Sequence, residues 1–155
     1  MFENHQRIAI DLDDTLLNGP ASKFLVDYVN DHPEKEFFIV THRTPAESRS
    51  VPMELKNIGL NINQFEKLMP TTELMRIRFR LDRNDREKNK LPSIYTDNVS
   101  TDEMSKNELN FVYWKGYVCK RLGITLIIDD ATPIVKPGAD RYHIEYINPY
   151  DIKLQ

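Results

Sequence analysis

Two segments of this chain each begin with an apolar run that is followed directly by carboxylates, and this repeated pattern constrains the fold more than any other feature. The segments are residues 8–17, with Asp11, Asp13 and Asp14, and residues 124–133, with Asp129 and Asp130. Because aspartate has a low strand propensity, an apolar run that breaks into acidic residues is typical of a buried strand ending at a polar site. Like charges about 4 Å apart repel by roughly 4 kcal/mol at an effective dielectric constant of about 20. The sequence therefore predicts a cation between two strand ends.

The residues that follow the first segment predict an α/β fold with a parallel sheet. Pro20 is placed to open a helix that continues to about Asn30, and residues 36–41 form a second apolar strand. A strand, a helix and a strand in this order make a βαβ unit, whose strands are parallel. The site of such a sheet lies at the carboxyl ends of its strands, where Asp11 and Thr41 are found.

Length and composition predict one domain, residues 1–155, of ordinary charge. The net charge of −3 argues against a nucleic-acid coat or a membrane-surface protein, and no membrane partner is expected. Cys119 is the single cysteine and the four histidines are scattered, so any metal should be held by oxygen ligands. The N-terminus lacks an apolar signal core, and no stretch approaches the roughly 18 apolar residues of a membrane span. We expect a cytoplasmic location.

Two aspartates of the first acidic segment are candidates for nucleophilic and acid–base chemistry. Asp11 and Asp13 project from the same side of an extended backbone, so one can act as nucleophile while the other handles protons. Their oxygens suit a hard cation such as Mg²⁺. An acidic turn that caps a helix, with Asp14 or Thr15 as the N-cap, is the alternative interpretation of these residues taken alone.

The string Asp11-x-Asp13-x-Thr15 after an apolar strand resembles the first motif of the haloacid dehalogenase-like (HAD) phosphatase superfamily. The resemblance implies a Rossmann-like three-layer α/β sandwich with a central parallel sheet. It also implies Mg²⁺ as cofactor, Asp11 as nucleophile and Asp13 as general acid and base. Only one helix fits between Thr15 and the second strand, so the resemblance is to capless members.

The end of the second strand is similar to the second motif of this superfamily. Thr41 matches its Ser or Thr, and Arg43 stands where several subfamilies carry a basic residue; with Thr15 and His42, Arg43 is a candidate substrate-binding residue. The alternatives are that Thr41 only favours the strand and that Arg43 is a solvated charge. A helix is expected from about Thr44 to Asn57, kinked or split at Pro52 and ended by Gly59, and its first amides could bind an anion.

A lysine falls within the apolar stripe of a helix that should end at Leu122. At about 100° per residue, Lys115 shares a sector with Val118 and Cys119, whereas Lys120 lies on the opposite side. A buried ammonium group needs an anion, since leaving it unpaired is costly. Lys115 thus resembles the lysine of the third HAD motif, and Lys120, which is nearer the next strand, is the alternative.

The second acidic segment resembles the fourth HAD motif in its Asp-Asp form. Comparison with Gly-Asp versions suggests that Asp130 touches the metal and Asp129 supports it, although either order is open. The resemblance thus implies a metal site of Asp11, Asp13 (through its backbone carbonyl), Asp129 and Asp130. Beyond it, Pro137-Gly138 predicts a turn and residues 142–147 a final strand.

Residues 73–98 form a predicted insert with a hairpin-like pattern. Residues 76–90 carry a net charge of +4, and Arg76, Arg78 and Arg80 alternate with apolar residues on one strand face. One interpretation is that these arginines contact a polyanionic substrate. The other is that they protect an exposed edge hairpin from aggregation.

Together the motifs predict an Mg²⁺-dependent phosphomonoester hydrolase. Its substrate is expected to be a nucleotide or a phosphorylated nucleic-acid end, with a phosphorylated small molecule as an alternative. A HAD-like binding or regulatory protein with weak turnover is the second interpretation, and a phosphotransferase or non-phosphate hydrolase is the third. The sequence leaves the oligomeric state open, a homo-oligomer included.

Overall fold

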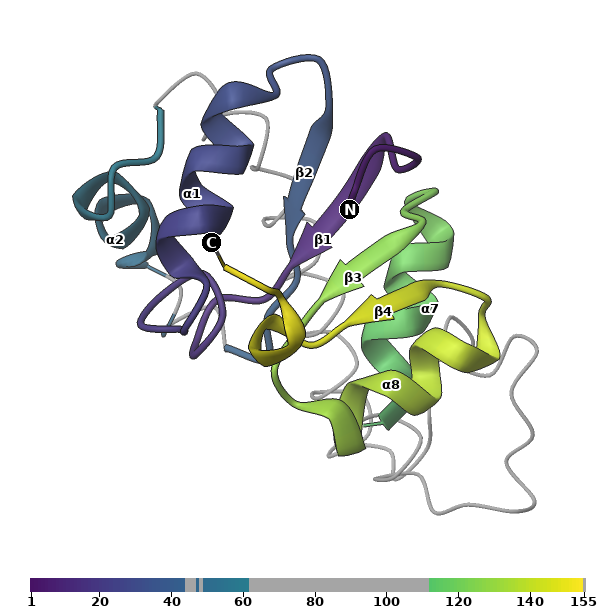
Figure 1. Cartoon of the computed structure of the whole chain (residues 1–155). Helices are drawn as coiled ribbons and strands as arrows, with labels where there is room; N and C mark the ends of the chain where they lie inside the picture. Colours follow the sequence, from purple (N-terminus) through teal and green to yellow (C-terminus); the bar gives the residue numbers. More distant parts are fainter. Residues whose placement is uncertain (44–46, 48, 62–111, 155) are drawn as a thin grey trace.

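A computed structural model describes residues 1–43, 47, 49–61 and 112–154 (Figure 1). The elements in chain order are β1 (Arg7–Ile10), α1 (Ser22–Asp31), β2 (Glu36–Ile39), α2 (Val51–Asn57), α7 (Trp114–Arg121), β3 (Leu126–Ile128), α8 (Thr132–Arg141), β4 (Glu145–Ile147) and the short 3₁₀ helix η2 (Pro149–Asp151). The insert predicted at 73–98 lies outside the described residues. So do two elements that the sequence also suggests, a strand at residues 64–69 and a helix that starts at the capping-box pattern of Ser100 and Glu103.

The described strands form one parallel sheet in the order β2-β1-β3-β4. Ile8 of β1 pairs with Phe37 of β2 on one side and with Leu126 of β3 on the other. From β1 the chain first adds β2 on one side, and later it adds β3 and then β4 on the other side. The strand order therefore reverses between β1 and β3, which makes these two strands a topological switch point. The predicted α/β class with a parallel sheet is confirmed.

Alternation along the strands builds two apolar layers. Ile8 and Ile10 belong to the core that includes the buried side chains of α1 and α2, whereas Ala9 belongs to the core with α7 and α8. Successive side chains of a strand point to opposite faces, so a short apolar run supplies both cores. Figure 1 shows α1 and α2 on one side of the sheet and α7 and α8 on the other, a three-layer arrangement.

The helix expected from Thr44 to Asn57 begins later than predicted. Thr44 lies outside the described residues, but Glu47, Arg49 and Ser50 are in turns and α2 starts at Val51. Pro52 therefore occupies the first turn instead of kinking a longer helix, because the first turn is where its missing N–H leaves no hydrogen bond unmade. Gly59 follows the helix with φ of 93°, as the predicted C-terminal glycine.

The turn predicted at Pro137-Gly138 is wrong, since both residues lie inside α8. Gly138 instead allows a close approach to the start of α7, since a Cβ atom on Gly138 would lie 2.8 Å from the Val112 carbonyl oxygen. Gly116 of α7 has the matching role, because a Cβ atom there would lie 2.2 Å from the Gly138 carbonyl oxygen. Tertiary packing of two glycine-bearing helices thus outweighs the local turn preference of a Pro-Gly pair.

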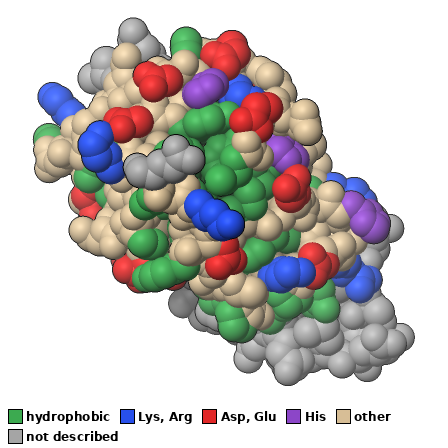
Figure 2. Space-filling view, viewed as in Figure 1, with side chains coloured by type: hydrophobic (Ala, Val, Ile, Leu, Met, Phe, Trp, Pro, Cys, Tyr) green, Lys and Arg blue, Asp and Glu red, His purple; other side chains and the backbone are tan. Residues whose placement is uncertain are grey.

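Charged side chains of both signs lie on the visible surface (Figure 2), as the small net charge predicts. Figure 2 shows Lys and Arg side chains mixed with Asp and Glu over the visible face, with hydrophobic side chains between them. Among the described helices, none is both long and apolar enough to cross a membrane.

Candidate active site

A tight loop after β1 carries the first acidic motif. Asp14 has φ of 61°, and the Leu17 amide donates to the Leu12 carbonyl at 2.8 Å, which folds the loop back on itself. Helix α1 starts only at Ser22. The alternative in which Asp14 or Thr15 caps a helix is therefore wrong.

A buried ion cluster lies at the carboxyl ends of the neighbouring strands β1 and β3. Lys115 of α7 donates from Nζ to Asp11 Oδ1 at 2.9 Å and to Asp129 Oδ2 at 2.6 Å. The exposed fractions are 2% for Lys115, 7% for Asp11 and 0% for Asp129. Lys120, by contrast, is exposed. The anion that a core-facing lysine requires is present, and the structure favours Lys115 over Lys120 as the lysine of the site.

The Thr15 hydroxyl lies within hydrogen-bond distance of a carboxylate from each of the two acidic motifs. Its buried hydroxyl lies 3.2 Å from Asp130 Oδ1 and 3.5 Å from Asp11 Oδ2, so it can donate to one of them at a time. Carboxylate oxygens of Asp11, Asp129 and Asp130 all lie within 4.8 Å of one another. The structure therefore brings both predicted acidic motifs to one point.

Burial and charge act in opposite directions within this cluster. Burial raises the pKa of Asp11 from 3.8 to about 7, even though Lys115 acts to lower it. Burial alone would lower the pKa of Lys115, but the adjacent carboxylates of Asp11 and Asp129 raise it above its usual value. Lys115 is thus a cation, and the ionised form of Asp11 carries a large desolvation cost.

The donor set of the cluster fits a hard divalent cation. Three carboxylates and one ammonium group leave an excess of two negative charges. Both oxygens of Asp129 are engaged, one by Lys115 and the other by the Ala131 amide at 2.9 Å. Asp130 is less buried than Asp129. Oxygen ligands with this net charge suit Mg²⁺.

The segment after β2 supplies Thr41, His42 and Arg43. Thr41 is 2% exposed, and its hydroxyl accepts a hydrogen bond from the Arg43 amide at 3.1 Å. The His42 ring packs beside Trp114 of α7, with 5.4 Å between ring centroids. Thr41 therefore follows β2 at the expected strand end, and His42 contacts Trp114 in the core.

Arg43 does not stand as a solvated charge but pairs with two carboxylates. Its guanidinium donates to Asp13 at 2.7 and 2.9 Å and to Glu54 of α2 at 2.6 and 3.2 Å. These hydrogen bonds from Arg43 lower the pKa of the Asp13 carboxyl. Asp13 is thus ionised in this arrangement and lies at the rim of the site, with an exposed side chain.

Comparison with protein families, curated proteins and solved structures found no match. The interpretation of the site therefore depends on its own geometry and on the motifs of the sequence. Of the predicted site residues, Arg76, Arg78 and Arg80 lie outside the described residues. The others, except His42, gather in two groups, one around Lys115 and one around Arg43, while His42 packs beside Trp114.

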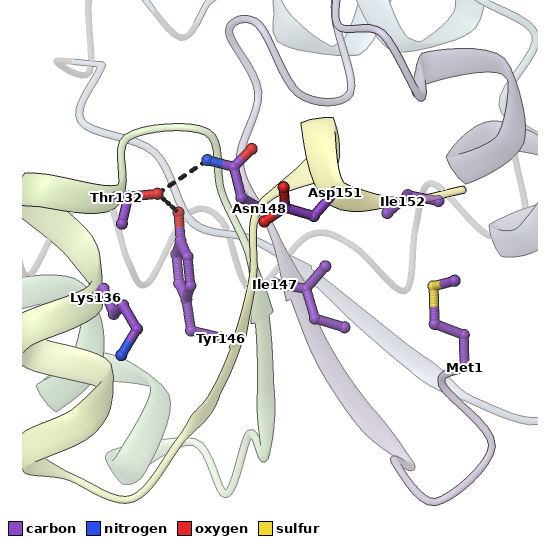
Figure 3. Close-up of a pocket in the computed structure, with 8 residues that line it drawn as sticks. All are labelled: Met1, Thr132, Lys136, Tyr146, Ile147, Asn148, Asp151 and Ile152. Carbon is purple, nitrogen blue, oxygen red and sulfur yellow. Dashed lines mark hydrogen bonds between the residues drawn. The ribbon is translucent and has the colours of Figure 1, made fainter. Parts of the chain in front are cut away.

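Two residues of β4 and the segment after it support the second acidic motif, and the sequence did not single them out. Tyr146 donates from its hydroxyl to the Asp129 carbonyl, and Asn148 donates to the Asp130 carbonyl at 3.2 Å. Asn148 also donates to Thr132 Oγ1 at 2.9 Å, which lies 2.8 Å from the Tyr146 hydroxyl. Figure 3 shows these three side chains pointing toward one another beside the pocket that they line. The available signal was their position at the carboxyl end of a parallel strand.

Proposed function

We propose that the protein is a phosphomonoester hydrolase of the HAD type that acts through an aspartyl-phosphate. The observation that carries the proposal is the buried cluster of Asp11, Lys115 and Asp129 at the ends of β1 and β3. The sheet order, with a switch point at these two strands, supports it because α/β sheets bind ligands at such points.

Asp11 is the nucleophile in this proposal. One carboxylate oxygen attacks phosphorus, a new O–P bond forms, and the bond from phosphorus to the leaving oxygen breaks. Asp13 gives a proton to the leaving oxygen, so the alcohol departs neutral. Arg43 lowers the pKa of Asp13 and so favours its ionised form. A phosphate dianion that approaches Asp13 acts in the opposite direction, because a neighbouring negative charge favours the protonated carboxyl that the first step needs.

Water completes the reaction. It attacks phosphorus, the bond between Asp11 and phosphorus breaks, and Asp13 accepts a proton from the water. The products are an alcohol and inorganic phosphate, and Asp11 returns to its carboxylate form. Asp13 thus serves as acid in the first step and base in the second, which one carboxyl can do when it stays at the same place.

Charge on the transferring phosphoryl group must be balanced. Lys115 holds Asp11 in place and offers a fixed positive charge, and Thr41 offers a hydroxyl after the neighbouring strand β2. Mg²⁺, when bound, would neutralise phosphoryl and carboxylate charge. Asp11 and Asp130 would be its side-chain ligands, with the Asp13 carbonyl, while Asp129 is committed to Lys115 and Ala131.

The substrate remains a prediction from the sequence. A nucleotide or phosphorylated nucleic-acid end is expected because of Arg76, Arg78 and Arg80, which lie outside the described residues. A binding or regulatory role without turnover is the second candidate. The desolvation that raises the pKa of Asp11 to about 7 argues against that role, since a buried carboxylate of this kind is costly to keep without chemistry that uses it.

The test is a turnover assay with Mg²⁺ over phosphorylated metabolites, nucleotides and phosphorylated oligonucleotides. Asp11→Asn keeps the size of the side chain but removes the nucleophile, so kcat should fall by about three orders of magnitude or more. Asp27→Asn is a matched control, because Asp27 forms an exposed pair with Lys23 on α1. Asp11→Asn with a tenth of wild-type turnover would show that the nucleophile is another residue.

A further inference from the structure

We infer that Arg43 and Glu54 are positioning residues that hold the Asp13 carboxylate in place, and that they do not bind the substrate phosphate. The inference rests on the proposed function, in which Asp13 transfers protons. The Arg43 guanidinium joins three separate parts of the chain: the loop after β1, the segment after β2, and helix α2.

Every N–H group of this guanidinium has an acceptor. Nε donates to Asp13 Oδ2 at 2.9 Å, and Nη2 donates to Asp13 Oδ1 at 2.7 Å and to Glu54 Oε1 at 3.2 Å. Nη1 donates to Glu54 Oε2 at 2.6 Å and to the Glu47 carbonyl at 3.4 Å. Arginine has five N–H donors and no acceptor. A phosphate could therefore bind this group only by displacing a contact that is already made.

The charge around Arg43 also opposes a further anion. One guanidinium lies between the carboxylates of Asp13 and Glu54, so this group of three side chains has a net negative charge. The Arg43 side chain is 14% exposed, which leaves little of it open to a ligand. A phosphate dianion would meet repulsion here unless one of the carboxylates moved away.

Glu54 is the fixed end of this chain of contacts and Asp13 is the end that needs support. Glu54 is on α2, whose neighbouring residues Val51 and Leu55 are buried in the core. Its carboxylate also accepts a hydrogen bond from Ser50 at 3.0 Å. The Asp13 side chain is 57% exposed, compared with 35% for Glu54. A two-pronged contact with arginine fixes the orientation of a carboxylate as well as its position.

Glu54→Gln tests the inference through the leaving group. An alkyl phosphate needs a proton on its leaving oxygen, whereas p-nitrophenyl phosphate has a leaving group that departs without one. A misplaced proton donor should slow only the hydrolysis of the alkyl phosphate. We therefore expect kcat/KM to fall about tenfold for the alkyl phosphate and less than about twofold for p-nitrophenyl phosphate. Inhibition by inorganic phosphate should be unchanged.

Glu36→Gln is the matched control, because Glu36 pairs with Arg7 at 2.6 Å at the opposite end of the sheet. Glu36→Gln should leave kcat/KM unchanged for both the alkyl phosphate and p-nitrophenyl phosphate. Equal losses on both substrates for Glu54→Gln, together with weaker inhibition by inorganic phosphate, would overturn the inference and make Arg43 a substrate-binding residue.

A double-mutant cycle separates positioning from a general structural effect. If Glu54 acts through Arg43 on Asp13, then Glu54→Gln should have no further effect on alkyl phosphate turnover in an Asp13→Asn protein. Independent, multiplying losses would overturn the inference.

Failure of the proposed function would be recognised separately, as absence of turnover by the wild-type protein on every phosphomonoester. The positioning contact is then tested by urea unfolding of the same variants. A combined shift of the midpoint smaller than the sum of the single shifts would support the contact. Additive shifts would overturn it.

Discussion

Replacing Asp11 by asparagine should stabilise the metal-free protein at neutral and alkaline pH. Burial raises the pKa of Asp11 from 3.8 to about 7. A raised pKa in the folded state means that the folded protein prefers the protonated carboxyl. The stability contributed by this group is therefore fully present below about pH 4 and is lost as the pH rises through about 7.

The magnitude follows from the size of this change. Each pH unit between the two pKa values corresponds to 1.36 kcal/mol, so ionised Asp11 lowers the free energy of unfolding by at most about 4 kcal/mol above pH 7. Asparagine has no such cost and can still accept a hydrogen bond from Lys115. We expect Asp11→Asn to match the wild type at pH 4 and to exceed it by about 2 to 4 kcal/mol at pH 8. For a domain of this size that is a Tm increase of roughly 6 to 12 °C.

The assay is urea unfolding in EDTA at a series of pH values, because a bound cation would itself favour the ionised carboxylate. Asp27→Asn serves as control, since Asp27 belongs to an exposed pair on α1. The control should follow the wild-type curve. A stability difference between Asp11→Asn and wild type that does not grow from pH 4 to pH 8 would contradict a raised pKa of Asp11. A variant less stable than wild type at pH 8 would contradict it as well.

Three further predictions concern the same cluster and its support. Lys115→Met leaves Asp11 and Asp129 buried without their cation and should lower the free energy of unfolding by about 3 to 5 kcal/mol in urea at pH 7; a loss below about 1 kcal/mol would contradict the buried pairing. Gly116→Ala places a methyl group against the Gly138 carbonyl and should cost about 1 to 3 kcal/mol by thermal unfolding, and an unchanged Tm would mean that α7 and α8 are less closely packed. Mg²⁺ at about 100 times its Kd should raise the free energy of unfolding by about 2.7 kcal/mol, and this increase should be smaller in Asp130→Asn. EDTA should abolish turnover, and full turnover in EDTA would exclude a role for the metal.

The strand ends of the site could be predicted from the sequence because their signal is local. A short apolar run followed by carboxylates identified β1 and β3, and the apolar stripe around Lys115 identified a lysine that needs an anion. Each of these signals lies within one helix or strand, so no knowledge of tertiary contacts was needed.

The remaining features depend on contacts between distant elements. Glu54 has no local relation to Arg43, and its role appears only when α2 packs beside the segment after β2. The turn expected at Pro137-Gly138 failed for a similar reason, because Gly138 lies against the backbone of Val112 and Tyr113, where a Cβ atom would not fit. The different roles of adjacent Asp129 and Asp130 depend on the backbone after β3, which directs one carboxylate to Lys115 and the other to Thr15.

Chemical trapping of the aspartyl-phosphate would identify the nucleophile of the proposed reaction. An acyl phosphate is reduced by borohydride to an alcohol, which converts the modified aspartate to homoserine. The protein would be quenched during turnover of a phosphomonoester with Mg²⁺, reduced, digested and mapped by mass spectrometry. We expect homoserine at position 11, formed only in the presence of substrate and absent from Asp11→Asn. Turnover with an unmodified Asp11 peptide, or with the modification at another residue, would contradict it.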